Sequence, residues 1–389
     1  MSKTLFLTLL IWLLSSKSWA EEYFDGIQIE LITISAGKNY WEAFGHSALR
    51  VKSATFDVMY GFGYFNFNDK DFFLNFARGD MRYFMGVVPT DVELDEYQDQ
   101  GRKITQQVLV LSAKQKHELL KTLEWLQKEE NRYYHYDYFL NNCTTKIRDI
   151  LDSVTQQTIS QHFKNNKTSQ SWSDLTFPTA NQAWMNLGIA IAYGMPAYQK
   201  RSQWQLSVFP ETFARDLSNI HSNAIKVLPM HTLYQPNRQE KAKMQVTFFA
   251  THYAVIVCVL VFLWLFFIKI SRNVAIKLWL ITETLLGIGL LLLMFFTQHS
   301  VATLNFNILL FNPLGFLLLF KRFNSPLALV IFFVLNLLWL VYALFVSNLY
   351  LFGFFTLNLT CLYFKICNCS HYRHCREGGN LINNNYNIW

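Results

Sequence analysis

One stretch decides how the first half of this chain is interpreted: Asn141-Asn142-Cys143-Thr144-Thr145-Lys146-Ile147-Arg148-Asp149-Ile150-Leu151. It comes directly after a turn and has the apolar spacing of a helix, which places Cys143 at or near a helix N-terminus. Unpaired amides and the positive end of the helix dipole at such a position stabilise a thiolate and lower the pKa of a cysteine. The stretch therefore predicts a reactive thiol at position 143.

The segments around this helix predict an antiparallel sheet. Alternating β-branched and aromatic residues are typical of strands over 27–34, 46–52, 55–67, 81–88 and 104–111. A short helix is expected over 71–78, and a longer one from Ser112, where Gln115 completes a capping box, to about residue 130. The Tyr-rich segment that follows is expected to be a connection. Beyond Ser171 the chain is expected to be helical and to pack on this core or on the membrane. The class is α+β with an antiparallel sheet.

The two ends of the chain and its apolar runs predict an exported membrane protein. Residues 1–20 have a basic start, a short apolar run and Ser18-Trp19-Ala20, which is typical of a cleaved signal peptide; an uncleaved anchor is the alternative. Residues 21–245 form the exported domain, and 246–366 form a bundle of about five transmembrane helices. The expected spans are 247–268, 276–297, 303–320, 325–346 and 348–364. A low-complexity tail, 367–389, completes the chain.

The third span is the weakest, because three asparagines and a proline interrupt it. Asn305, Asn307 and Asn312 are expensive in lipid, so they are expected to face the bundle interior or the catalytic domain. They are the candidate polar groups of the bundle.

Basic residues at the ends of the spans predict the orientation. Lys and Arg flank the first and third connections and the tail, whereas the second and fourth connections carry none. The positive-inside rule then places residues 21–245 in the periplasm and the C-terminus in the cytosol. The net charge of +7 reports this topology, and no basic patch interleaved with aromatics predicts a nucleic-acid partner.

Cysteine usage singles out the same thiol. Cys143 is the only cysteine of the exported domain, because the others lie in the spans or the tail. A lone cysteine in an oxidising compartment is unusual unless it has a function. A buried, inert thiol is the alternative. A nucleophilic thiol also needs a base, and His46, at the start of a strand after Gly45, has the most suitable setting. His135, in the Tyr-rich segment, is its main competitor.

Several motifs in this order resemble one family, the Lnb type of lipoprotein N-acyltransferase, formerly a domain of unknown function. The motifs are Phe44-Gly45-His46-Ser47-Ala48-Leu49-Arg50-Val51, Tyr60-Gly61-Phe62-Gly63-Tyr64-Phe65-Asn66-Phe67, Phe76-Ala77-Arg78-Gly79, Gln100-Gly101-Arg102, Asn131-Arg132-Tyr133-Tyr134-His135-Tyr136-Asp137-Tyr138-Phe139 with Asn142-Cys143-Thr144-Thr145, and Asn305-Phe306-Asn307-Ile308-Leu309-Leu310-Phe311-Asn312-Pro313-Leu314. They cover most of residues 27–155 and part of the bundle. The chain departs from the family at Gly61 and Phe62, where Asn-Tyr is expected, which predicts the loss of a polar contact in the pocket.

The resemblance implies a papain-like fold in permuted order, similar to lecithin–retinol acyltransferase-like enzymes, with the histidine strand before the cysteine helix. It implies Cys143 as nucleophile and His46 as base. Asp57 is the first candidate for orienting His46, with Asp137 and Tyr60 as rivals. Backbone amides at the start of the Cys143 helix, together with Asn142, are the candidate oxyanion donors.

The predicted function is acyl transfer at the bacterial inner membrane. Cys143 takes an acyl chain from a phospholipid donor, and the N-terminal amine of a diacylglyceryl-cysteine lipoprotein accepts it. One alternative is a periplasmic cysteine hydrolase of lipid esters or peptidoglycan peptides. The other is a non-catalytic membrane assembly protein. No cofactor and no metal are predicted.

Overall fold

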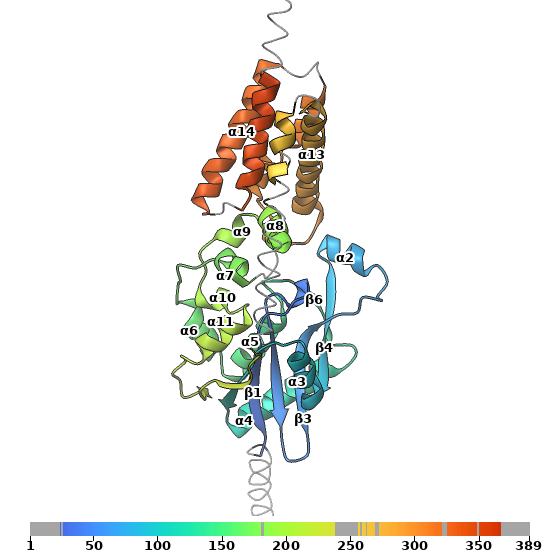
Figure 1. Cartoon of the computed structure of the whole chain (residues 1–389). Coiled ribbons are helices and arrows are strands. Elements are labelled where there is room, and N and C mark those ends of the chain that lie inside the picture. Colours follow the sequence, from blue (N-terminus) through green and yellow to red (C-terminus); the bar gives the residue numbers. More distant parts are fainter. Residues whose placement is uncertain are drawn as a thin grey trace, which may run out of the picture. The chain divides into compact units, whose positions relative to one another are not determined.

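The computed structural model describes residues 24, 26–179, 183–237, 256, 259–261, 263–268, 272–320, 325–347 and 350–366 (Figure 1). The chain divides into two compact units. The first is Met1–Asn181 with Gln199–Gln245, and the second is Gln182–Tyr198 with Val246–Trp389. The predicted signal peptide 1–20, most of the first predicted span and the tail 367–389 lie outside the described residues.

An antiparallel sheet forms the centre of the first unit, as the alternating segments predict. Its strand order is β6-β4-β3-β2-β1-β5-β7, with β8 also paired to β5. The strands are β1 (Gln28–Ile34), β2 (His46–Lys52), β3 (Asp57–Tyr64), β4 (Met81–Pro89), β5 (Ile104–Val110), β6 (Tyr133–Tyr136), β7 (Lys226–Val227) and β8 (His231–Tyr234). The Tyr-rich segment, expected as a connection, supplies strand β6.

Helices flank the sheet. They are α2 (Phe72–Arg78), α3 (Thr90–Asp99), α4 (Ala113–Gln127), α5 (Cys143–Val154), α6 (Thr158–Lys164), α7 (Trp172–Thr179), α10 (Gln203–Leu206) and α11 (Pro210–Leu217), with a 3₁₀ helix η1 (Tyr40–Glu42). The capping box predicted for α4 is present, since the Ser112 hydroxyl accepts the Gln115 N–H and Gln115 Oε1 accepts the Ser112 N–H. Helix α3 was not predicted.

Two buried clusters show how the strand alternation places these helices. On one face, side chains of the strands pack with α4, α5 and α11; this cluster includes Leu31, Leu49, Phe62, Leu123, Ile147, Leu151 and Phe213. On the other face, the intervening positions pack with Leu94 and Tyr97 of α3; this cluster includes Ile32, Ile34, Ala48, Met59 and Ile104. Because neighbouring residues of a strand point to opposite faces, β1, β2, β3 and β5 each supply both clusters.

The second unit is helical. It comprises α8 (Ala183–Ala192), α9 (Met195–Tyr198), α13 (Arg272–Phe296), η2 (Ser300–Ala302), η3 (Phe306–Leu309), η4 (Pro313–Leu319) and α14 (Pro326–Phe345). Helices α13 and α14 are long and apolar enough to cross a membrane, and Phe306–Leu319 and Phe352–Ile366 are shorter apolar helical stretches. Residues 182–198 cluster with this unit, whereas the boundary predicted at residue 245 places them in the exported domain.

The third predicted span is not one continuous helix. It consists of the two 3₁₀ helices η3 and η4, separated at Asn312, whose side chain caps η4 by accepting the Leu314 N–H at 3.0 Å. Pro313 has no N–H with which to continue a preceding helix, so the helix is interrupted at this point.

Candidate active site

Asn142 fixes the start of helix α5 and thereby the position of Cys143. The Asn142 side-chain oxygen accepts the Thr145 N–H at 2.9 Å, and its Nδ2 donates to the carbonyls of Tyr138 and Val208, both at 2.9 Å. The side chain is buried and both amide hydrogens are used. Asn142 therefore anchors the helix and has no hydrogen to offer an oxyanion, contrary to the role expected from the sequence.

The Cys143 thiol lies at the N-terminus of α5, as predicted, but the effect on its pKa is the reverse of the expectation. The thiol is partly buried, and its sulfur is 3.8 Å from the Thr144 hydroxyl. Burial raises the pKa of the thiol, and this outweighs the lowering by the backbone amides of Ser47, Thr144 and Cys143 itself. The resting group is a neutral thiol rather than a thiolate.

His46 begins strand β2, opposite Ile34 at the end of β1. Gly45 leads into it with φ +81°, and a Cβ there would lie 2.6 Å from the Ile34 carbonyl oxygen, so this turn requires glycine. The next residue, Ser47, has its hydroxyl 3.2 Å from that of Thr144 in α5. This contact brings the His46 end of β2 to the Cys143 end of α5. No hydrogen bond joins the imidazole to the thiol in the described part of the chain.

A buried polar cluster surrounds the His46 ring. The ring centroids of Tyr64 and Tyr97 both lie 6.3 Å from that of His46. Their hydroxyls donate to one oxygen of Glu93, at 2.9 and 2.8 Å, and Glu93 is buried. Burial, and next the positive charge of Arg102, lower the pKa of His46 to about 3, so its imidazole is neutral at physiological pH.

Asp57, the first candidate for orienting His46, lies beside the other end of strand β2, away from His46. It pairs with Lys52, six positions along β2 from His46, which corresponds to roughly 20 Å of strand. Its carboxylate accepts from the guanidinium of Arg50, and this hydrogen bond lowers the pKa of Asp57. Asp57 therefore supports the far end of β2 and β3.

The rival candidates also have other surroundings. Tyr60 packs on the core that includes α4 and α5, and burial, followed by the charge of Glu124 on α4, raises its pKa. Asp137 accepts the backbone N–H groups of Phe139 and Leu140, at 2.8 and 2.9 Å, and so shapes the turn before α5. The polar groups beside His46 are instead Tyr64 and Tyr97, together with Glu93, to which both hydroxyls donate.

His135, the competitor for the role of base, faces away from the thiol. It is 45% exposed, with Nε2 3.8 Å from an Asp80 oxygen. A Cβ built at Gly63 would lie 3.8 Å from both the Cys143 Cβ and the Tyr136 ring. Tyr136, the strand neighbour of His135, thus takes the side of β6 toward Cys143, and alternation turns His135 outward. Of the two histidines, His46 has the better placement.

The departure at Gly61 has a steric explanation. A Cβ at Gly61 would lie 2.7 Å from the Tyr64 hydroxyl, and one at Gly86 would lie 2.8 Å from the Tyr64 ring. The Tyr64 ring therefore occupies the space that a larger residue at position 61 would need.

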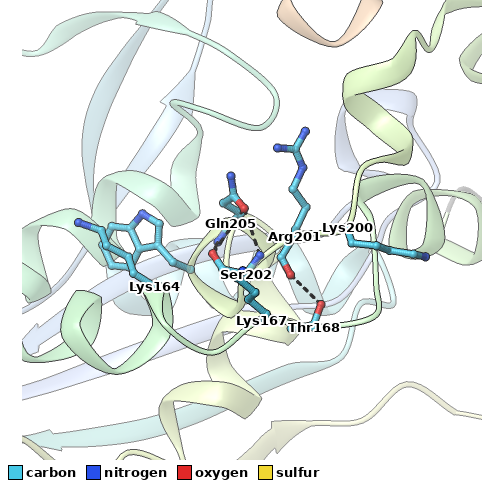
Figure 2. Close-up of a pocket in the computed structure, with 8 residues that line it drawn as sticks. Lys164, Lys167, Thr168, Lys200, Arg201, Ser202 and Gln205 are labelled. Atoms are coloured by element: carbon cyan, nitrogen blue, oxygen red, sulfur yellow. Dashed lines mark hydrogen bonds between the residues drawn. The ribbon is translucent and has the colours of Figure 1, made fainter.

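The first unit also contains a cavity of about 500 Å³ (Figure 2). The residues that line it are Lys164, Lys167, Thr168, Lys200, Arg201, Ser202, Trp204 and Gln205. Neither Cys143 nor His46 is among them, and one of its four basic side chains, Lys200, pairs with Asp174 at 3.3 Å.

The asparagines of the third apolar segment, Asn305, Asn307 and Asn312, are buried in the second unit. Asn305 Nδ2 donates to the carbonyls of Ile191 and Ala192, at 2.8 and 2.9 Å, at the end of α8. Asn307 Nδ2 donates to the Ala190 carbonyl at 2.8 Å, and its oxygen accepts from Trp339 at 3.1 Å. These side chains satisfy backbone groups that the end of a helix leaves open.

Asn312 has a buried acidic partner in α13. Its backbone N–H donates at 3.2 Å to Glu283, which is fully buried in α13. The sequence carries a signal for this contact, because an acidic residue within an apolar membrane segment usually has a polar partner inside the bundle.

Comparison with known families agrees with the resemblance noted in the sequence. Residues 15–176 match the family model described as the Lnb N-terminal periplasmic domain. This range includes both His46 and Cys143. No curated protein and no solved structure matches the chain. A periplasmic domain of this family and two apolar helices suited to a bilayer indicate a membrane protein with a periplasmic domain.

Proposed function

We propose that this chain, whose residues 15–176 belong to the Lnb N-terminal periplasmic domain family, is a thiol acyltransferase that N-acylates lipoproteins. The observation that carries the proposal is the pairing of the α5 N-terminus with the start of β2. It brings a thiol, three backbone amides and a neutral imidazole to one end of the sheet. A nucleophile beside a base and oxyanion donors is what acyl transfer through a thioester requires.

The first half-reaction forms a thioester at Cys143. As its sulfur attacks the ester carbonyl of a phospholipid, His46 takes the thiol proton. The negative charge that develops on the carbonyl oxygen is stabilised by the amides of Ser47 and Thr144. The carbon–oxygen bond then breaks, and His46 returns the proton to the departing oxygen of the lysophospholipid.

The second half-reaction moves the acyl chain to the lipoprotein. The α-amine of a diacylglyceryl-cysteine attacks the thioester, and His46 takes a proton from the nitrogen. When the carbon–sulfur bond breaks, His46 gives that proton back to the sulfur of Cys143. An amide forms, and both groups return to their neutral resting states.

The scheme starts from a neutral thiol and a neutral imidazole. A raised thiol pKa and a lowered imidazole pKa keep the proton on sulfur until a substrate binds. A neutral imidazole retains the lone pair that general-base catalysis needs. The missing hydrogen bond between the two groups is consistent with this, because catalytic hydrogen bonds are often long until the substrate is bound.

The proposal extends to fold and location. The His strand precedes the Cys helix, which supports a permuted papain-like arrangement. The apolar helices support an inner-membrane bundle that presents lipid to a periplasmic domain, with the C-terminus in the cytosol.

The direct test is transfer by the full-length protein in phospholipid vesicles. A diacylglyceryl lipopeptide is added, and mass spectrometry measures acyl addition to its amine. Cys143→Ser is expected to abolish transfer, and Cys361→Ala, which removes a buried thiol of the second unit, is expected to preserve it. Full transfer by Cys143→Ser would contradict the proposal.

Two further arms separate the alternatives. Transfer in vesicles of non-hydrolysable ether lipids would identify the lipopeptide's own glyceryl ester as the acyl donor. Release of free fatty acid without transfer would identify a hydrolase.

A further inference from the structure

Arg102 comes to the same edge of the sheet as His46. Strands β2 and β5 both flank β1, and Ile34 at the end of β1 pairs with His46 on one side and Ile104 on the other. Beyond this pair the two segments remain joined by hydrogen bonds. The Ser35 N–H donates to the Lys103 carbonyl at 2.9 Å, and the Ser35 hydroxyl accepts the Lys103 N–H at 2.9 Å. Lys103, which links Arg102 to β5, is therefore held at the histidine end.

The Arg102 guanidinium is buried with one nitrogen unused. The side chain is 3% exposed. Its Nε donates to the Ser35 carbonyl at 2.9 Å, and Nη1 donates to Gln100 at 3.1 Å. Nη2 is also buried and has no hydrogen-bond partner. Within the described ranges no carboxylate forms an ion pair with Arg102. Burial of a cation with an open donor is unfavourable unless an anion satisfies it.

The surroundings of Arg102 overlap with those of the catalytic pair. Its guanidinium carbon lies 4.9 Å from the centroid of the Tyr97 ring, and the same ring lies 6.3 Å from that of His46. The charge of Arg102 acts on both His46 and Cys143. The open donor therefore belongs to the neighbourhood of the reacting atoms.

We propose that Arg102 forms an anion-binding subsite beside Cys143, in which Nη2 donates to a negatively charged oxygen of the substrate. The identity of that oxygen rests on the proposed function, whereas the subsite itself does not. Two oxygens have the required chemistry. One is a non-bridging oxygen of the donor's phosphodiester, and the other is the oxyanion of the tetrahedral intermediate on Cys143.

The subsite is tested first without any acyl transfer, with inorganic phosphate as the probe. Alkylation of Cys143 by iodoacetamide is followed by mass spectrometry of its peptide in the full-length protein, at constant pH and ionic strength. Phosphate is expected to slow alkylation saturably, whereas chloride does not. Equal alkylation rates in phosphate and chloride would overturn the subsite, and this result needs no variant.

Variants then assign the effect to Arg102. Arg102→Gln is expected to remove the protection by phosphate, and Arg102→Lys to retain part of it, because it keeps the charge. Arg82→Gln, which removes an exposed guanidinium over the Tyr133 ring, is the matched control and should leave protection unchanged. Protection that persists in a folded Arg102→Gln variant would place the anion elsewhere and overturn the assignment.

Two donors distinguish the two oxygens. Acylation of Cys143 is measured with a phospholipid and with a diacylglycerol, which lacks phosphate. Loss of one charged hydrogen bond is expected to slow acylation by Arg102→Gln about ten- to a hundredfold with phospholipid. A smaller loss with diacylglycerol assigns the phosphodiester, and an equal loss assigns the oxyanion. No loss with either donor would overturn a role in the reaction. If the wild type itself is not acylated while phosphate still protects Cys143, the proposed function fails and the subsite stands.

Discussion

At the scale of single residues, the protonation state of Cys143 is the first quantity to measure. Because burial outweighs the helix amides, its pKa is raised, and alkylation should accelerate only at a higher pH than for a free cysteine. The measurement is the pH profile of iodoacetamide labelling on the Cys143 peptide, with N-acetylcysteine as reference. If labelling of Cys143 reached half its maximal rate at a lower pH than labelling of the reference, the resting group would be a thiolate, contrary to this prediction.

His46 predicts how stability depends on pH. Its pKa is lowered from 6.5 to about 3 in the folded protein, so between these values the unfolded chain binds more protons and stability falls as the pH falls. From pH 8 to pH 5 this amounts to about 2 kcal/mol. His46→Gln cannot titrate, so its thermal unfolding midpoint should depend less steeply on pH over this range. Parallel pH profiles for wild type and variant would show that His46 titrates normally.

These two residues also mark what the sequence could predict. The position of Cys143 at a helix start follows from local sequence, because turn, cap and apolar spacing all lie within eleven residues. The direction of its pKa shift depends on how deeply the folded chain buries it, which no local pattern records. The same holds for the contact between Glu93 and Tyr64, because Tyr64 reaches Glu93 from strand β3, whereas Tyr97 lies four residues from Glu93 on the same helix.

At the scale of the elements, the start of α5 depends on Asn142. Asn142→Ala removes a helix cap and leaves the carbonyls of Tyr138 and Val208 without their donor, so a loss of roughly 1–3 kcal/mol in unfolding free energy is expected. Asn219→Ala, which removes an exposed amide bonded to the Arg215 carbonyl, should cost much less. Chemical denaturation of the full-length protein measures both. Unchanged stability with lost activity would instead restore Asn142 as an oxyanion donor.

Strand periodicity identified β1 to β5 because each of these strands places apolar side chains in at least one of the two buried clusters. The same periodicity did not predict β6, because its sequence Tyr-Tyr-His-Tyr shows no alternation of apolar and polar residues. It also did not predict α3, which has few apolar positions. It also could not supply the register. Asp57 is on the strand next to His46, as expected, yet the pairing of Asp57 with Lys52 separates the two.

At the scale of the whole molecule, the second unit depends on buried asparagines that join its helices. Asn307→Leu removes hydrogen bonds to the Ala190 carbonyl and the Trp339 ring nitrogen, and the expected loss of stability is about 1–3 kcal/mol. Gln298→Leu changes an exposed amide of the same unit and is the control. Thermal unfolding in detergent compares them. An unchanged thermal unfolding midpoint in Asn307→Leu would contradict a role of this asparagine in packing and would favour a role in substrate binding.

The third apolar segment shows a second limit of the sequence. Its asparagines and Pro313 predicted an interruption, and the break between η3 and η4 lies there. Asn305 and Asn307 donate to carbonyls of α8, which lies more than a hundred residues earlier in the chain. Only the folded unit therefore shows how these buried amides are satisfied.

If the mechanism is as proposed, Cys143 carries the acyl chain as a thioester intermediate that can be detected by its mass. The full-length protein is incubated in phospholipid vesicles without an acceptor, and the mass of the Cys143 peptide is determined. We expect a gain of one acyl chain on Cys143, which hydroxylamine removes and which disappears when a diacylglyceryl lipopeptide is added. An unmodified Cys143 peptide in a preparation that nevertheless N-acylates the lipopeptide would contradict this mechanism.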